Sequence, residues 1–366
     1  MFTKLRRLNG HTDTVWDVAT TNDNIYTASW DGKVLEWDVH NGNMGRDFSG
    51  DDGHAGQVWS CDIDTKNDVL LTVGDDLNVK GWDLKSSESD ENGYGKLHGT
   101  VEGVHESPVY FVRSLPSEKE SKVVFVTGSQ DGSIKTWVAD LENDFRCKEP
   151  LQHLEEAHDG GVLCGAVGIA ADGNSIFATS GSDTCVRIWD IKDEGLSSIV
   201  TLGKDRDEVV GHNAAVSCIA FPRSTGHGML ATGSWDGVAI LWDMRCAAPM
   251  VASWEAHRQN LSGVVFYGDT VCITASSDQE DAMKLWDLRL LRRACIRSGG
   301  QINPYEVVEP WQVMSRHTNT ICGLQMLPDE SQVVSVSSDQ SAVQWHAQSL
   351  PFDEKEPAKS ACCSVQ

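Results

Sequence analysis

The feature that most constrains this chain is a tryptophan that recurs at similar spacing along it. The segments 26–38 "YTASWDGKVLEWD" and 231–243 "ATGSWDGVAILWD" are alike, and 177–190 "FATSGSDTCVRIWD" follows the same pattern. The marker tryptophans are Trp37, Trp82, Trp137, Trp189, Trp242, Trp286 and Trp345, separated by 44 to 59 residues. A four-stranded propeller blade repeats about every 40–45 residues, and loop insertions explain the longer intervals. The sequence therefore predicts seven stacked units that bury one another's apolar faces.

Three other residue types accompany each tryptophan. A histidine lies upstream: His11, His54, His105, His158, His212, His257 and His317. A hydroxyl residue follows: Thr27, Thr72, Thr127, Thr179, Thr232, Thr274 and Ser335. An aspartate comes next, usually six residues before the tryptophan: Asp31, Asp76, Asp131, Asp183, Asp236, Asp278 and Asp339. Asp278 is followed by a two-residue insertion in its turn. Polar side chains that recur in this way can form a buried network, which specifies one geometry when every member is satisfied.

With these residues, the chain resembles the WD40-repeat family over residues 3–347. The resemblance implies that His, Ser/Thr, Asp and Trp form a hydrogen-bonded structural tetrad in each blade. It implies that the seven histidines are structural, rather than metal ligands or bases. The expected fold is all-β, a seven-bladed β-propeller.

The expected domain organisation is one propeller over residues 1–347 and a flexible tail over 348–366. We expect blades near 9–48, 49–98, 99–150, 151–205, 206–252 and 253–312, with the last built from 313–347 plus 2–8. A propeller must protect its strand edges, so "FTKLRRLN" at the start is predicted to close the seventh blade. Proline, serine and charge in "PFDEKEPAKS" are typical of a tether.

Composition excludes several classes of function. The net charge of -24 would repel phosphates, so no nucleic-acid partner is expected. No apolar run approaches the roughly 20 residues of a membrane span, and "MFTKLRRLNGHTD" has no secretory apolar region.

The 11 cysteines form no C-x-x-C pair, which favours a reduced intracellular protein without a metal site. We find no catalytic motif, so we expect no enzyme activity, cofactor or small-molecule substrate. Four cysteines occupy similar positions in the first strand of their blades, where we expect them to be small buried hydrophobic residues: Cys61, Cys164, Cys218 and Cys322.

Aromatic residues suggest where partners would bind. The family resemblance implies docking near the central channel, through a residue early in the first strand and the residue before the tetrad aspartate. At these positions the candidates are Trp16, Trp30, Trp59, Tyr110 and Trp235, whereas other blades have Ser182, Ser262, Ser277 and Ser338. Such a cluster resembles a binding hot spot, although the indoles could instead pack only between blades. Asp75 and Asp76, with the overall charge, favour a partner protein with a basic segment.

Two consecutive W-D-x-R boxes offer a different interpretation. Arg245 and Arg289 end them, in a pattern that resembles substrate receptors of cullin-type ubiquitin ligases. In those proteins the side of the propeller that carries the arginine would contact the ligase adaptor. Alternatively, each arginine caps a strand end or pairs with a neighbouring aspartate. The helical segment with which such receptors usually dock is not evident at either terminus.

The last four residues, "CSVQ", fit the C-a-a-X pattern for prenylation at Cys363. Cys362 could carry a palmitoyl chain, and one lipid alone gives only marginal attachment. Basic residues around the outer edges of blades six and seven could add to it: Lys4, Arg6, Arg7, Arg289, Arg292, Arg293 and Arg297. The alternative is an unmodified tail.

We therefore expect a non-catalytic scaffold or adaptor in the cytoplasm or at the cytoplasmic face of a membrane, and a nuclear location also fits. No heptad run precedes His11, unlike the pattern of a G-protein β subunit.

Overall fold

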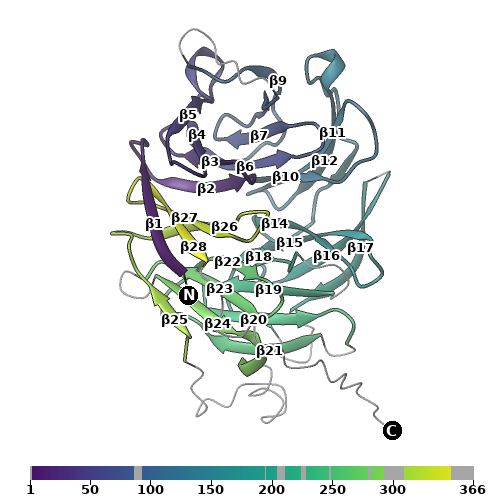
Figure 1. Ribbon diagram of the computed structural model, residues 1–366. Coiled ribbons are helices and arrows are strands. Elements are labelled where there is room, and N and C mark those ends of the chain that lie inside the picture. Colours follow the sequence, from purple (N-terminus) through teal and green to yellow (C-terminus); the bar gives the residue numbers. More distant parts are fainter. Residues whose placement is uncertain are drawn as a thin grey trace.

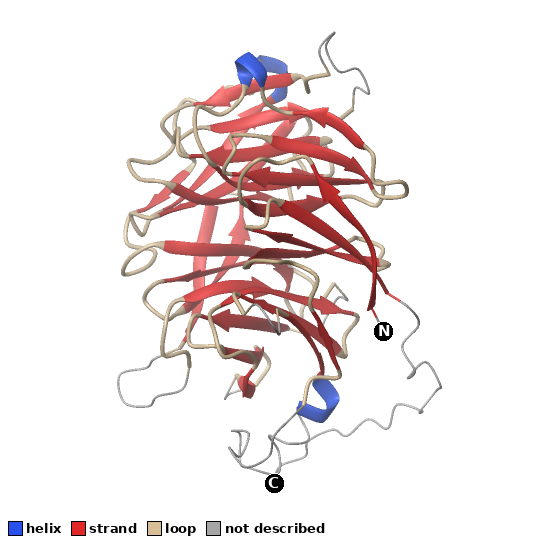
Figure 2. Ribbon diagram, turned by 90° about the vertical axis from the view of Figure 1, so that its left-hand side faces the viewer, coloured by secondary structure: helices blue, strands red, loops and turns tan. Residues whose placement is uncertain are grey.

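The computed structural model describes residues 2–85, 93–193, 195–203, 211–223, 228–246, 249–278, 282–291 and 309–347. These residues form seven four-stranded antiparallel sheets, which are the blades of a β-propeller (Figure 1). Figure 2 shows that the chain is almost entirely strand and loop. Two short 3-10 turns lie at Gly50–Asp52 and Leu141–Asn143. The predicted all-β, seven-bladed fold is confirmed.

Each of the first six blades is built from four consecutive strands. Blade one comprises β2 (Val15–Thr20), β3 (Asn24–Ser29), β4 (Val34–Asp38) and β5 (Met44–Asp47). Blade two comprises β6 (Val58–Asp64), β7 (Val69–Gly74), β8 (Val79–Asp83) and β9 (Leu97–Val101). Blade three comprises β10 (Val109–Leu115), β11 (Lys122–Ser129), β12 (Ile134–Asp140) and β13 (Gln152–Leu154). Blade four comprises β14 (Val162–Ile169), β15 (Ser175–Gly181), β16 (Val186–Lys192) and β17 (Gly195–Leu202). Blade five comprises β18 (Val216–Ala220), β19 (Met229–Ser234), β20 (Val238–Asp243) and β21 (Met250–Glu255). Blade six comprises β22 (Leu261–Tyr267), β23 (Val271–Ser276), β24 (Met283–Asp287) and β25 (Gln312–Met314).

The seventh blade closes the ring with both ends of the propeller. It contains β26 (Ile321–Met326), β27 (Gln332–Ser337) and β28 (Ser341–Ala347), and its outer strand is β1 (Phe2–Asn9). Phe2 lies opposite Ala347 and Asn9 opposite Ser341, in antiparallel register. The predicted closure by the N-terminal strand is therefore confirmed.

Outer strands run past four of the expected blade limits, and one of them is β25, which pairs with β24 and ends at Met314 rather than near 312. β9 ends at Val101 rather than near 98, and β21 ends at Glu255 rather than near 252. β13 pairs with β12 and so belongs to the third blade, although it begins at Gln152. The expected limits followed the motif residues, whose hydroxyl and tryptophan members lie on the second and third strands and whose histidine and aspartate members lie in the connecting loops. The outer strand has no such marker, so its end depends only on pairing. The tail over 348–366 lies outside the described residues.

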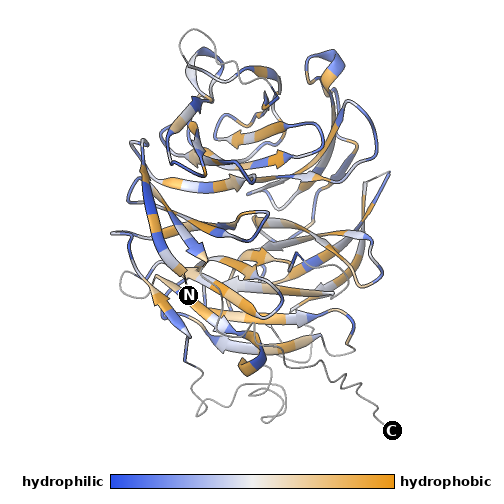
Figure 3. Cartoon of the chain, in the orientation of Figure 1, coloured by the Kyte–Doolittle hydropathy of each residue, from blue (hydrophilic) through white to orange (hydrophobic). Residues whose placement is uncertain are grey.

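Apolar residues fill the spaces between adjacent blades. Five central strands are buried throughout their length: β7, β8, β19, β23 and β27. Figure 3 shows apolar stretches along the strands and hydrophilic residues in many connecting turns. One core cluster joins blades six and seven, because Ile273 and Leu285 group with Val333 and Trp345. Each blade therefore buries its faces against its neighbours, as stacked repeats must.

Candidate interaction site at the channel mouth

A shared hydroxyl oxygen organises the tetrad in every blade. Thr27 Oγ1 lies 2.8 Å from His11 Nε2 and accepts a hydrogen bond from Trp37 Nε1 at 2.8 Å. Across the seven blades the corresponding distances are 2.7–2.9 Å to the imidazole and 2.8–2.9 Å to the indole. A neutral imidazole that accepts at Nε2 and donates from Nδ1 satisfies this chain of bonds. The seven hydroxyl residues are fully buried, which favours a structural role for the network.

The aspartate contact separates the blades into two groups. The His Nδ1–Asp distance is 2.9–3.0 Å in blades one, two, four and seven. It is 3.5, 3.6 and 3.9 Å in blades three, five and six. In blade three, His105 Nδ1 lies 3.0 Å from Ser133 Oγ instead. In blade six, the two-residue insertion after Asp278 lengthens the turn that carries this carboxylate. The tetrad geometry is therefore tightest in four of the blades.

The described residues hold no cluster suited to a metal ion, and three inner-strand thiols are poor nucleophiles. No group of three or more His, Cys, Asp or Glu side chains within this part of the chain could hold a metal ion. Burial raises the pKa of the Cys322 thiol to about 12, and it also raises the pKa of Cys61 and Cys164. These thiols are protonated at neutral pH and are poor nucleophiles.

An irregularity in each inner strand builds the mouth of the central channel. The pairing register of all seven inner strands shifts at the same place, for example between Val15 and Asp17. A β-bulge of this kind re-aims the side chain of the extra residue. The residues at these shifts are Trp16, Trp59, Tyr110, Leu163, Ser217, Ser262 and Cys322, and all line the central cavity. The ring is therefore aromatic on blades one to three and small or polar on blades five to seven.

Four of the five predicted aromatic residues meet at this mouth, and we call Trp16, Trp30, Trp59 and Tyr110 the aromatic cluster. Trp16 and Trp30 stack with ring centroids 4.9 Å apart. Trp59 meets both edge-on at 5.1 and 5.2 Å, and Tyr110 lies 5.7 Å from Trp59. All four side chains are partly exposed. The rings do pack between blades, as the alternative interpretation held, yet they also present surface at the mouth.

The fifth aromatic residue stands apart. Trp235 on blade five is 48% exposed, and within the described residues it makes no ring contact with the aromatic cluster. The structure therefore does not join it to the other four.

An exposed carboxylate borders the aromatic cluster. Trp59 Nε1 donates a hydrogen bond to Asp75 Oδ1 at 2.5 Å, and Asp75 is exposed. Asp75 precedes the tetrad residue Asp76, whose carboxylate faces inward to His54. An aromatic surface with a negative charge beside it is suited to basic side chains.

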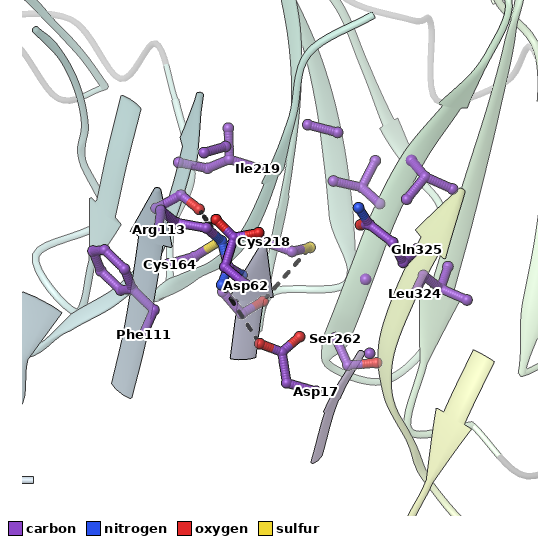
Figure 4. A pocket seen from close by; sticks show the side chains of 18 of the residues that line it. Asp17, Asp62, Phe111, Arg113, Cys164, Cys218, Ile219, Ser262, Leu324 and Gln325 are labelled. Atoms are coloured by element: carbon purple, nitrogen blue, oxygen red, sulfur yellow. Dashed lines mark hydrogen bonds and ion pairs between the residues drawn. The ribbon is translucent and has the colours of Figure 1, made fainter. Parts of the chain in front are cut away.

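Below the mouth lies a cavity of about 390 Å³ with charged side chains in its wall (Figure 4). Arg113 Nη1 lies 3.5 Å from Asp17 Oδ2 and donates to Ser60 Oγ at 2.9 Å. Ser60 Oγ in turn donates to Asp17 Oδ2 at 2.7 Å, and Arg113 Nε donates to the Gly165 carbonyl at 3.0 Å. These bonds tie the inner strands of blades one to four together. Sequence reasoning missed this network, whose only signal was charge within the inner strands "VWDVAT", "VWSCDID" and "VYFVRSL".

The two W-D-x-R arginines pair locally. Arg245 donates to both oxygens of Asp243, at 2.8 and 2.6 Å. Arg289 bonds to Asp287 in the same way, at 2.9 and 2.7 Å. This geometry matches the neighbouring-aspartate interpretation, although the two side chains remain 46% and 41% exposed.

Most residues of the predicted lipid attachment are not described by the structure. Cys362, Cys363, Arg292, Arg293 and Arg297 fall outside the described residues. On β1, Arg6 donates to the His40 carbonyl at 2.7 Å and Arg7 donates to the Arg316 carbonyl.

With this geometry in place, comparison with known proteins identifies the class. The family model "WD domain, G-beta repeat" matches residues 2–38, 48–83, 148–190, 203–243 and 308–346. The chain therefore belongs to the WD40-repeat family, as its sequence pattern predicted.

Its similarity to individual proteins is modest. It is 27% identical over 246 residues to the guanine nucleotide-binding protein subunit beta of Solanum tuberosum, covering 65% of this chain and 58% of the relative. It is 26% identical over 254 residues to pre-mRNA-processing factor 19 of Oryza sativa subsp. japonica, covering 69% and 41%. A guanine nucleotide-binding protein subunit beta-like protein of Encephalitozoon cuniculi is 21% identical over 312 residues, covering 80% and 81%. The chain thus spans less than two thirds of the first two relatives.

One structural finding bears on membranes. Among the described residues, none of the helices has the length and apolar character needed to cross a bilayer.

Proposed function

We propose that this protein is a non-catalytic interaction scaffold that binds partner proteins through the aromatic cluster. One observation carries the proposal. Side chains from three blades that are distant in the sequence meet at the channel mouth and stay partly exposed. Tryptophan and tyrosine supply much of the binding energy at protein interfaces, because each buries a large rigid surface.

The partner segment is expected to be basic. Asp75 adds an exposed charge to the rim, and the chain carries a net charge of -24. Complementary charge speeds association and selects among partners. The centroid distances of 4.9–5.2 Å among the three indoles mean that the rings touch. A partner side chain would therefore lie against the aromatic cluster rather than between its rings.

Peptide display on the immobilised protein tests this proposal. We expect enrichment of peptides with basic residues, and we expect Trp59→Ala to weaken their binding at least about tenfold, since hot-spot truncations commonly cost 2 kcal/mol or more. Trp235→Ala is the matched control, because it removes an exposed indole outside the aromatic cluster. Equal binding by both variants, with unchanged melting temperatures, would contradict the proposal.

A second candidate function is that of a cullin-type ubiquitin-ligase substrate receptor. The observation in its favour is that Arg245 and Arg289 take the same pose on adjacent blades with exposed guanidinium groups. Recovery of the ligase adaptor with the wild type, and its loss in Arg245→Ala/Arg289→Ala, would support it. Recovery that is the same for both proteins would reject it.

Lipid tethering stays a prediction from the sequence. Its test is the mass of the C-terminal peptide from eukaryotic cells, with the membrane-bound share of wild type and Cys363→Ser measured in parallel. A farnesyl mass and a membrane share that disappears in the variant are expected. An unmodified peptide would reject the tether.

A further inference from the structure

The inner strands place their side chains at successive depths in the channel. Trp59 and Tyr110 stand at the mouth, at equivalent register shifts. Three residues further along the same strands come Asp62 and Arg113, and the corresponding residue of β26 is Gln325. All three line the cavity, with Gln325 on the other side of it from Arg113 (Figure 4). The channel therefore has an aromatic entrance on one side, and beneath it these three polar residues share their depth with apolar ones at the equivalent positions, Ala166, Ala220 and Val265.

The charges in this wall are unequally paired. Arg113 forms an ion pair with Asp17 within the network described above, and its charge also acts on Asp62. Asp62 Oδ2 accepts a hydrogen bond from the Ser114 amide at 2.7 Å, but among the described residues no cationic nitrogen lies within ion-pairing distance of its carboxylate. Asp17 and Asp62 thus share the charge of one guanidinium, Arg113, while the other arginine of the cavity wall, Arg223, donates to the Met326 carbonyl. A partly buried carboxylate that has no ion pair in contact gains from a further cation. Burial raises the pKa of Asp62, with Arg113 opposing the effect.

We infer that the channel receives an arginine side chain of the basic partner segment, which passes the aromatic cluster and pairs with Asp62. The inference rests on the proposed function and specifies how the same site would be occupied. The volume of about 390 Å³ lies within the 300–1,000 Å³ typical of sites that enclose a ligand. The aliphatic stem of the arginine can pack against the rings of Trp59 and Tyr110 at the mouth, while its planar guanidinium reaches deeper and donates to several acceptors at once. Asp62 and the amide oxygen of Gln325 supply acceptors on two sides of the cavity.

The test uses two nine-residue peptides made of glycine, alanine and serine around one central residue, arginine or its neutral analogue citrulline. Calorimetric titration of the wild type should show saturable binding of the arginine peptide and binding at least about tenfold weaker for the citrulline peptide. Asp62→Asn should weaken the arginine peptide by about the same factor, because removing one partner of a desolvated charge pair mainly increases dissociation. The asparagine keeps an oxygen for the Ser114 amide, so the strand pairing is preserved.

Asp23→Asn is the matched control, since it removes the same charge from a turn residue with an 82% exposed side chain. Its affinity for the arginine peptide should equal that of the wild type. Equal affinity of the wild type for both peptides, or an unchanged affinity in Asp62→Asn, would overturn the inference. If such binding still required Trp59, the aromatic interface would stand and only the channel site would fail. No saturable binding of the arginine peptide would also overturn the channel site, while the display experiment would decide the proposed function separately.

Discussion

At the scale of single residues, the tetrad hydroxyl is the point at which each blade is most sensitive. Thr27 Oγ1 is the partner of both the His11 imidazole and the Trp37 indole, and all three side chains are buried. Removing this oxygen leaves the His11 imidazole nitrogen and the Trp37 indole N–H without their shared hydrogen-bond partner. Each unsatisfied buried polar group costs about 1–3 kcal/mol.

Thr27→Val should therefore lower the free energy of unfolding by about 2–4 kcal/mol, since valine keeps the shape but removes the hydroxyl. Urea denaturation followed by tryptophan fluorescence measures the change. Thr201→Val is the control, because Thr201 is an exposed strand residue, and its effect should stay within about 0.5 kcal/mol. A loss no larger for Thr27→Val than for this control would show that the oxygen contributes little.

At the scale of elements, β1 completes a blade whose other three strands come from the far end of the propeller. It buries Phe2 and Leu8 near its two ends, whereas Thr3, Lys4 and Leu5 are exposed. Without β1, the backbone groups of β28 would be unpaired along an exposed edge, which invites edge-to-edge association.

Deleting residues 1–9 should lower the melting temperature and cause aggregation, because it uncovers β28 and removes about 1.5–3 kcal/mol for each large apolar side chain that was buried. Thermal unfolding and size-exclusion chromatography measure both effects. The control is Lys4→Thr/Leu5→Thr, which keeps the backbone pairing and changes only exposed side chains. A deletion variant as stable and monomeric as this control would argue against closure by β1.

At the scale of the whole molecule, repeated burial of titratable groups makes stability depend on pH. Burial lowers the pKa of His105 to about 4, with Asp131 opposing the shift. Burial would raise the pKa of Asp236, but the nearby His212 imidazole and hydrogen bonds from the Asn213 and Val238 amides outweigh it and bring the pKa to about 2. In both cases the unfolded chain binds protons more readily than the folded chain, so acid destabilises the propeller.

The free energy of unfolding should fall between pH 6.5 and about 4 through His105, by on the order of 3 kcal/mol at most. It should fall further between about pH 4 and 2 through Asp236. Urea denaturation at pH 7 and pH 4.5 tests the first interval. His105→Gln should flatten the slope there, whereas His40→Gln, at a 73% exposed side chain, should not. An unchanged slope in His105→Gln would assign the acid sensitivity to other groups.

The repeat alone determined the class of fold. Each tetrad lies within one blade, and its members are separated by few residues, as Thr27 and Trp37 are by 10. Their recurrence therefore predicted the family, the seven blades and the need for β1 to close the ring. The positions of Trp16, Trp30, Trp59 and Tyr110 could also be nominated, because the family pattern marks which residues face the channel mouth.

Only the tertiary structure decided how those residues meet. The register shift in each inner strand turns Trp16 and Trp59 toward the mouth, and the spacing of the blades brings their rings to 5.1 Å. The ion pair between Asp17 and Arg113 likewise joins strands of two different blades. The outer limit of blade three at Leu154 depends on pairing with β12. Contacts within a repeat follow from the repeated pattern itself, whereas contacts between blades depend on residues that differ from one repeat to the next and become neighbours only when the ring closes.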